Sequence, residues 1–290
     1  MNTSNVEAPS GKNAASENFP VGSWLIAKHL RPHVAAFYAF ARCIDDIADS
    51  AELNPEDKLN RLAGFSEALN GNPVENDADY IKALDLKDSL IETGINVAHA
   101  QDLITAFRQD CVKNRYDSWQ DLVAYCELSA APVGRYLIDL HAINRERSIY
   151  KASDKLCIAL QVINHLQDLK DDYESLDRVY LPADWIVQEA VCVENLGDER
   201  VTAGMRAVID RTLDATEMLL LEAQRVHLEI VDRRLAMEAS VIWQIAKALC
   251  SKLRRFDPLE RRVTLSKISL VWCFIRGIVA CLGNRREGRL

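Results

Sequence analysis

Three aspartates stand close together near the end of a segment whose other residues are mostly apolar. Asp45 and Asp49 are four positions apart, and Asp46 lies between them. On a helix, the four-residue spacing places the first two carboxylates on one face, and Asp46 is rotated from Asp45 by about 100°. Like charges at this spacing destabilise a helix, and the negative end of the helix dipole adds to the cost. A hard cation such as Mg²⁺, which prefers carboxylate oxygens, would offset it.

A second polar stripe lies in the middle of the chain. Asn164, Asp168 and Asp172 are spaced i, i+4 and i+8, so they share one helix face, with Gln161 at its edge. The other positions of this helix are mostly apolar, whereas a solvated face usually mixes in Lys and Glu. Either acidic segment alone is compatible with an exposed helix surface. The presence of two such segments in one chain favours a metal site.

The two segments together predict a specific kind of chemistry. Facing each other, they would present five carboxylates and an amide to one cavity. Buried carboxylates without partners would cost several kcal/mol each, and Mg²⁺ ions with a diphosphate would neutralise them. Metal binding makes diphosphate a better leaving group, and its departure from an allylic or cyclopropylcarbinyl carbon leaves a carbocation. An apolar, aromatic cavity would protect that cation from water.

The composition indicates which elements must hold these residues. Hydrophobic residues make up 49% of the 290 residues, while Gly and Pro number only 11 and 8, which favours an all-α protein. The first acidic segment predicts a helix over 34–50, opened by Pro32. Periodicity and break signals predict further helices over 55–70, 78–92, 97–113, 117–130, 132–144, 151–175, 181–190, 200–230, 234–255 and 260–283. No strand and no internal repeat is expected.

The ends of the chain and its charge limit the remaining possibilities. Residues 1–17 are small and polar and predict a disordered tail, followed by a single all-α domain over 18–285. The net charge of −8 argues against a nucleic-acid partner. None of the eight Cys forms a CxxC pair, which argues against zinc and favours a reducing cytoplasm. The apolar run 268–283 is interrupted by Arg276 and predicts a buried core helix, with a helix on a membrane surface as the alternative.

The residues around both acidic segments resemble the squalene/phytoene synthase family. Residues 37–49 are similar to the first aspartate-rich motif of the family, and residues 161–172 to the second. The further matching segments are 107–116, 125–134 and 178–182. The matches occur in the family's order and extend over about 18–283. The resemblance implies an all-α isoprenoid-synthase fold (terpenoid synthase type I), a helical bundle with a central cavity, with Mg²⁺ as the cofactor and a prenyl diphosphate as the substrate.

The resemblance also implies roles for individual residues. The implied Mg²⁺ ligands are Asp45, Asp46, Asp49, Asn164, Asp168 and Asp172. The implied diphosphate contacts are Arg42 and Gln161, the residues expected to close the site are Arg178 and Tyr180, and the expected cavity or flap residues are Phe19 and Tyr125. Tyr180 and the four aspartates at 45, 49, 168 and 172 are the expected catalytic residues. Further candidates for diphosphate contacts are Asp110, Lys113, Arg115, Arg262 and Lys267.

Within the family, segments 17–23 and 129–135 are most similar to the hydroxysqualene synthases of the bacterial hopanoid pathway. These enzymes ionise presqualene diphosphate and let water capture the cation. Gln167 stands where many other family members carry Arg, and the loss of that cation suits an enzyme that handles one diphosphate. The resemblance further implies a cytoplasmic enzyme, peripheral at the inner face of the membrane, with partner enzymes of the same pathway.

Three other functions stay open at the level of the sequence. The first is condensation of two farnesyl diphosphates to presqualene diphosphate or squalene, or of their C20 analogues to phytoene. The second is a terpene cyclase, which would share the metal logic but not the Arg-Val-Tyr-Leu-Pro segment at 178–182. The third is a non-catalytic assembly factor, which would be free to lose its acids. No GxGxxG loop follows a strand, so no tightly bound nicotinamide cofactor is expected, and the use of NADPH stays undecided.

Overall fold

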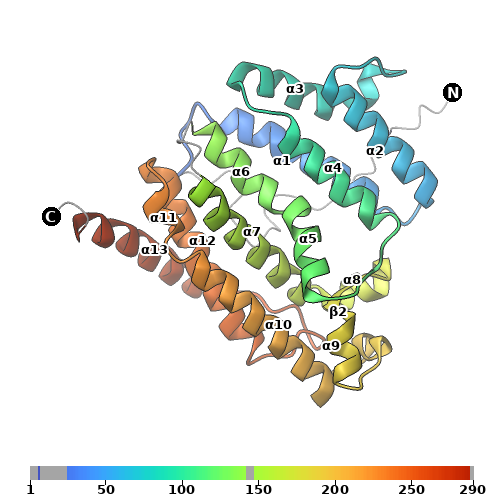
Figure 1. Ribbon diagram of the computed structural model, residues 1–290, viewed down its shortest axis with the longest axis vertical. Helices are drawn as coiled ribbons and strands as arrows, with labels where there is room; N and C mark the ends of the chain where they lie inside the picture. The colour runs from blue at the N-terminus through green and yellow to red at the C-terminus, as the bar shows by residue number, and fades with distance from the viewer. Residues whose placement is uncertain (1–5, 7–24, 142–146, 288–290) are drawn as a thin grey trace. The chain divides into compact units, whose positions relative to one another are not determined.

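The computed structural model describes residue 6 and residues 25–141 and 147–287, and these residues form an almost entirely helical protein (Figure 1). The prediction of an all-α fold is confirmed. The expected tail at 1–17 lies outside the described residues except for Val6, as does Phe19. Among the described residues, no helix is both long and apolar enough to cross a bilayer.

The chain divides into two compact units. Unit 1 comprises 1–113 and 139–142, and unit 2 comprises 114–138 and 143–290. The first acidic cluster therefore belongs to unit 1 and the second to unit 2. The prediction of a single domain over 18–285 stays a prediction.

Unit 1 is built around a long acidic helix. Its elements are α1 (Arg31–Asp49), α2 (Pro55–Asn70), the 3₁₀ helix η1 (Asp77–Tyr80), α3 (Ile81–Thr93) and α4 (Ala98–Asp110). Helix α1 packs against α2, α3 and α4 and buries Phe40 and Ile44 completely. Asn54 caps α2 by accepting a hydrogen bond from the backbone N–H of Asp57, and Gly71 ends α2 in the left-handed conformation, at φ 80°. These signals explain why the bounds predicted for α2 are confirmed.

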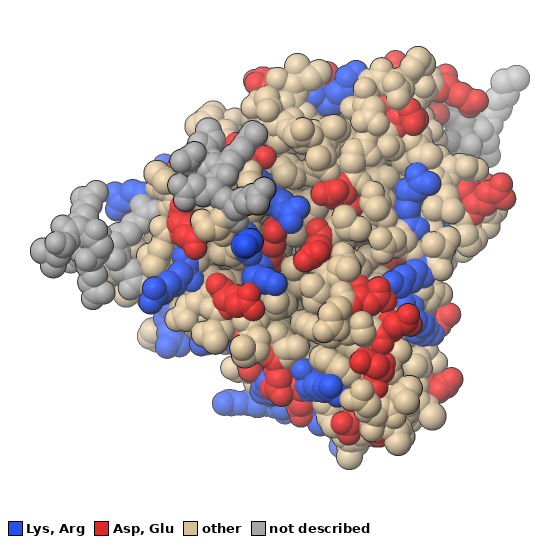
Figure 2. All heavy atoms as spheres, in the orientation of Figure 1, with Lys and Arg blue, Asp and Glu red and all other residues tan. Residues whose placement is uncertain are grey.

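Unit 2 contains the remaining elements. They are β1 (Arg115–Tyr116), α5 (Trp119–Ser129), α6 (Ala131–Leu140), α7 (Arg147–Gln167), α8 (Leu169–Leu176), β2 (Val179–Pro182), α9 (Ala183–Gln188), η2 (Val193–Gly197), α10 (Ala203–Glu222), α11 (Val226–Glu229), α12 (Arg233–Leu253) and α13 (Lys267–Glu287). The last two residues of α6 are the exception, because they fall in unit 1. Helix α7 packs against α5, α10 and α12, and α13 runs along α12. On the face drawn in Figure 2, Lys and Arg side chains are interspersed with Asp and Glu rather than separated from them.

Four local features of unit 2 differ from the prediction. The helix expected over 200–230 is two helices, α10 and α11, and the helix expected over 260–283 begins only at Lys267, as α13. The other two differences lie next to the second acidic cluster.

The helix expected over 151–175 is divided at Asp168, whose φ of −107° and ψ of 13° place it between α7 and α8. Backbone hydrogen bonds still run from the Asp168 N–H to the Asn164 carbonyl (3.0 Å) and from the Asp172 N–H to the Asp168 carbonyl (2.8 Å). The polar stripe therefore survives the break.

The last difference is a short parallel strand pair. Strands β1 and β2 pair with Arg115 opposite Val179, and the Val179 N–H donates to the Asn114 carbonyl at 2.9 Å. Strand β1 has two residues and β2 has four, all buried, so neither shows an alternation that a sequence pattern could reveal. The two strands are also more than sixty residues apart in the sequence. The pair brings Tyr116 next to the loop that follows the second acidic cluster.

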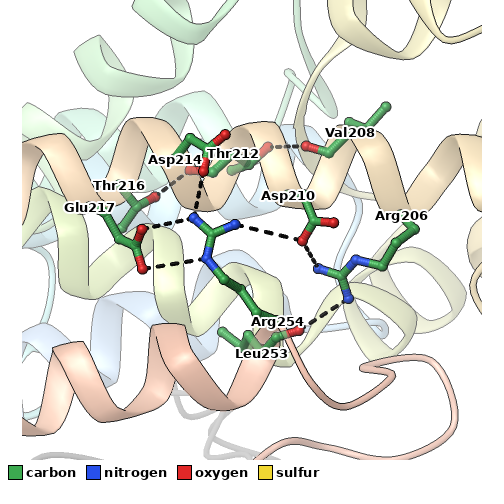
Figure 3. A network of polar contacts seen from close by, with 9 residues as sticks. All are labelled: Arg206, Val208, Asp210, Thr212, Asp214, Thr216, Glu217, Leu253 and Arg254. Atoms are coloured by element: carbon green, nitrogen blue, oxygen red, sulfur yellow. Dashed lines mark hydrogen bonds and ion pairs between the residues drawn. The ribbon is translucent and has the colours of Figure 1, made fainter.

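A charged network joins α10 to the end of α12 (Figure 3). Arg254 contacts Asp214 at 2.5 Å and Glu217 at 2.8 Å, with Asp210 at 3.9 Å. Arg206 donates to the Leu253 carbonyl at 3.1 Å, which satisfies an acceptor at the C-terminus of α12. The network fixes the point at which the loop 254–266 leaves α12.

Candidate active site

The first acidic cluster lies at the C-terminal end of α1. Arg42, one turn earlier, reaches Asp45 at 3.0 Å and Asp46 at 2.5 Å. Asp46 is buried, while the side chain of Asp45 keeps 30% of its surface exposed. One guanidinium therefore balances two of the three carboxylates, and an ion could still reach Asp45 from solvent.

The electrostatic cost of this cluster is visible in the titration of Asp45. Burial raises the pKa of Asp45 well above its ordinary value, and the neighbouring carboxylate of Asp49 raises it further. Arg42 lowers the pKa, but Asp46 and the buried Asp110 of α4 raise it again. A site that holds more negative charge than its own arginine neutralises favours an added cation.

The end of α1 is supported by a cation from the next helix. Lys58 of α2 donates to the Ala48 carbonyl at 2.9 Å. A positive charge at a helix C-terminus offsets the dipole that the aspartates make worse. Lys58 thereby holds the aspartate-bearing turn in helical form.

The second acidic cluster follows the junction of α7 and α8. Asn164 lies in the last turns of α7, Asp168 stands at the junction, and Asp172 follows in the first turn of α8. Arg262 of the loop 254–266 binds Asp168 through two nitrogens, Nε to Oδ1 and an Nη to Oδ2, the latter at 2.9 Å. Such a paired contact matches the planar guanidinium to the carboxylate. In both clusters an arginine therefore faces an expected metal ligand.

The loop that carries Arg262 is fastened by Gln167. The Gln167 side chain is 2% exposed, and its amide donates to the backbone carbonyl of Val263. Gln167, which stands where many family members carry Arg, is therefore engaged in a buried hydrogen bond within the protein. A cation comes to Asp168 from position 262 instead.

Aromatic rings pack beside the second cluster. His165 stacks on Tyr180 with ring centroids 3.6 Å apart, and Tyr116 and Tyr125 lie 5.5 and 5.6 Å from Tyr180. All four rings are buried. The predicted residues Tyr125 and Tyr180 are thus brought together.

His165 also links this aromatic group to the polar stripe. Its Nε2 lies 3.2 Å from the amide nitrogen of Gln161, and its Nδ1 lies 3.7 Å from a carboxylate oxygen of Asp172.

The sequence alone gives His165 no role in the site, because it lies off the stripe of Asn164, Asp168 and Asp172. Tyr116 belongs to the matching segment 107–116, but the sequence assigns it no role, because the β1–β2 pairing that places it beside Tyr180 carries no sequence signal. For His165, the four-residue offset from Gln161 was available as a signal.

The other expected contacts have varied surroundings. The Arg178 side chain is buried, and its backbone N–H donates to the Asp172 carbonyl at 3.0 Å, which ties the start of β2 to the cluster. Arg115 instead pairs with the exposed Asp177 at 2.5 Å, and hydrogen bonding to Arg115 lowers the pKa of Asp177. Lys113 is the last residue of the first segment of unit 1, and Lys267 begins α13, where it is exposed.

The donor set at each cluster fits Mg²⁺. Carboxylate oxygens and one amide oxygen are hard ligands of the kind that Mg²⁺ selects, and the raised pKa of Asp45 marks an unmet demand for positive charge. Among the described residues, no three His, Cys, Asp or Glu side chains converge closely enough to hold a metal. Arg42 pairs with Asp45 and Arg262 pairs with Asp168, so a metal that binds these carboxylates must displace the two guanidinium groups.

Comparison with known proteins identifies the family. A family model described as squalene/phytoene synthase matches residues 12–269. The chain belongs to the squalene/phytoene synthase family. Within this family, it is 39% identical to a hydroxysqualene synthase of Rhodopseudomonas palustris, over 93% of this chain and 90% of that protein. A hydroxysqualene synthase of Zymomonas mobilis is 38% identical, over 89% of this chain and 86% of that protein.

A solved structure of another squalene/phytoene synthase agrees with this family fold. The crystal structure of the squalene synthase HpnC from Alicyclobacillus acidocaldarius has a TM-score of 0.71 and 29% sequence identity. The match covers 83% of this chain and 90% of that chain. The isoprenoid-synthase fold expected from the motifs is confirmed.

Proposed function

We propose that this chain is a hydroxysqualene synthase, which converts presqualene diphosphate and water into hydroxysqualene and diphosphate. The observation that carries the proposal is identity of 38–39% to two hydroxysqualene synthases over about nine tenths of the chain. Both acidic clusters that such a reaction needs are retained, each beside an arginine.

The proposed reaction divides into ionisation and capture. The carbon–oxygen bond to diphosphate breaks, and its electron pair leaves with the diphosphate. Mg²⁺, when bound, neutralises the leaving group. The residues that would hold the metal are Asp45, Asp49, Asp168 and Asp172, with Asn164 and Asp46 in support. Arg42 and Arg262, once released from their carboxylates, bind the diphosphate oxygens as planar donors.

Capture of the carbocation needs an apolar, aromatic wall. The buried rings of Tyr116, Tyr125 and Tyr180 offer π faces that stabilise positive charge and exclude bulk water. His165 holds Tyr180 by stacking and keeps Gln161 close. One water oxygen then bonds to the cation, and its proton passes to solvent.

The runner-up is condensation of two prenyl diphosphates to presqualene diphosphate, squalene or phytoene. That reaction handles two diphosphate groups, whereas position 167 is a neutral amide engaged with Val263. The absence of a cation at this position favours the reaction with one diphosphate. A non-catalytic assembly role would leave both acidic clusters without a purpose.

Product analysis in ¹⁸O-labelled water tests the proposal. Purified protein with Mg²⁺ should convert presqualene diphosphate into hydroxysqualene that carries one ¹⁸O atom, detected by mass spectrometry. The chain should leave farnesyl diphosphate unchanged. Consumption of farnesyl diphosphate alone would favour the condensation, and failure to consume either substrate would favour the assembly role.

The proposal includes a place in the cell. Substrate and product are long hydrocarbons that dissolve in a bilayer, so we propose a cytoplasmic enzyme that is peripheral at the inner face of the membrane. Enzymes that supply presqualene diphosphate and consume hydroxysqualene are its proposed functional partners.

A further inference from the structure

Helix α13 has an inner face that packs closely on α12. Cys273, Gly277 and Cys281 follow each other at four-residue steps, and both cysteines are buried. A Cβ at Gly277 would lie 2.6 Å from the Val241 backbone, and Ser240 donates to the Gly277 carbonyl at 2.8 Å. This contact fixes which side of α13 faces outward.

The outward face of α13 is also apolar. Its exposed residues are Ile268, Val271, Trp272, Ile275, Val279 and Leu282, with 41–74% of their surfaces accessible. Their spacing places all six within roughly 100° of arc, opposite the seam on α12. The prediction of a buried core helix is therefore wrong for this face. A helix that is apolar on both sides favours a further apolar surface over bulk water.

Basic residues flank this apolar stripe. On the helix, Lys267 falls on one side of the stripe and Arg276 on the other, and both are exposed. The sequence that follows adds Arg285, Arg286 and Arg289 against the single acid Glu287. The segment 267–290 is thus strongly basic, although the whole chain carries a net charge of −8.

We propose that the stripe of α13 docks on the surface of an anionic lipid bilayer. In this position the helix lies parallel to the membrane, with Trp272 and the aliphatic residues among the acyl chains and with Lys267 and Arg276 at the headgroups. Anionic lipid matches the local positive charge. A second copy would place one basic segment beside another, so the charge pattern favours lipid over self-association. The inference rests on α13 alone and does not depend on the proposed chemistry.

Vesicle co-sedimentation with the full chain tests the proposal. The wild-type chain should bind vesicles of mixed phosphatidylglycerol and phosphatidylcholine, bind phosphatidylcholine alone weakly, and dissociate as salt rises. The triple variant V271S/W272S/I275S should bind the anionic vesicles at least about tenfold more weakly. The matched control I91S/V112S/V187S removes three other exposed apolar side chains, 67–76% accessible, and should bind like the wild type.

Two further measurements separate docking from its alternatives. Circular dichroism should show that both triple variants keep the wild-type helicity and melting temperature. The variant R276E should bind less tightly than the wild type, and most of that loss should disappear in high salt. The proposal is overturned if the wild type fails to bind anionic vesicles or if both triple variants bind equally. It is also overturned if the wild type is a dimer that only V271S/W272S/I275S converts to a monomer.

Discussion

At the scale of single residues, each acidic cluster contains at least one carboxylate that pairs with an arginine. Arg42 spans Asp45 and Asp46, and Arg262 makes a two-nitrogen contact with Asp168. An arginine that competes with a cation lowers the affinity for that cation. The same guanidinium becomes available to an anion once the cation is bound.

We expect Arg262→Gln to strengthen Mg²⁺ binding in the absence of substrate. The pair with Asp168 is partly exposed, so its removal should increase affinity by no more than about fivefold, which corresponds to about 1 kcal/mol. Calorimetric titration of the substrate-free protein measures the change. Arg115→Gln, which disrupts a comparable pair with Asp177, should leave the affinity unchanged. Weaker binding by Arg262→Gln would show that Arg262 supports the metal rather than competing with it.

The raised pKa of Asp45 gives a prediction for stability. The folded, metal-free chain binds the Asp45 proton more tightly than the unfolded chain. Protonation of Asp45 therefore adds to the free energy of unfolding. This contribution is fully present below the ordinary carboxylate pKa of about 3.9, and it is lost as pH rises through the raised pKa of Asp45 in the folded chain. At pH 7 in EDTA, Asp45→Asn should therefore raise the free energy of unfolding.

The gain of Asp45→Asn should shrink as pH falls toward 4, where Asp45 of the wild type is protonated. Chemical denaturation across this pH range measures the difference. Asp171→Asn, an exposed aspartate off the polar stripe, is the matched control and should change little. A loss of stability in Asp45→Asn at pH 7 would mean that the pair with Arg42 outweighs the repulsion.

At the scale of elements, the structure separates what a sequence pattern can and cannot predict. Capping signals and periodicity were sufficient for α2 and for the course of α1, because these depend on local residues. The break at Asp168 and the β1–β2 pair were missed because both depend on contacts between distant segments. The same reason hides Arg262, which meets Asp168 only through a loop that Gln167 fastens.

The network between α10 and α12 gives a prediction at this scale. Arg254→Ala leaves Asp214 and Glu217 without their shared cation, and it should lower the free energy of unfolding by about 1–2 kcal/mol. Denaturant unfolding measures the loss. Arg200→Ala, whose side chain is 77% exposed and 3.7 Å from Glu260, should cost almost nothing. If the two variants are equally stable, the ion pairs of Arg254 contribute nothing measurable to the free energy of unfolding.

At the scale of the whole molecule, the order of the motifs along the chain was sufficient to predict the family and the fold. The same motifs predict the site residues, and that assignment stays a prediction. The structure brings together Gln161, Tyr125 and Tyr180 through His165. The two acidic clusters lie in different units, so their convergence on one diphosphate is not described by either unit. It stays a prediction that kinetics can test.

The most direct test is a double-mutant cycle on turnover of presqualene diphosphate. Asp49→Asn in unit 1 and Asp172→Asn in unit 2 should each lower kcat/KM by at least about 100-fold. The reason is that each variant removes a proposed Mg²⁺ ligand that the ionisation of the substrate needs. The double variant should be little worse than the poorer single variant, since residues that act as a unit are not additive. Asp171→Asn should keep wild-type turnover. Full activity in either single variant, or losses that multiply in the double variant, would contradict a shared site.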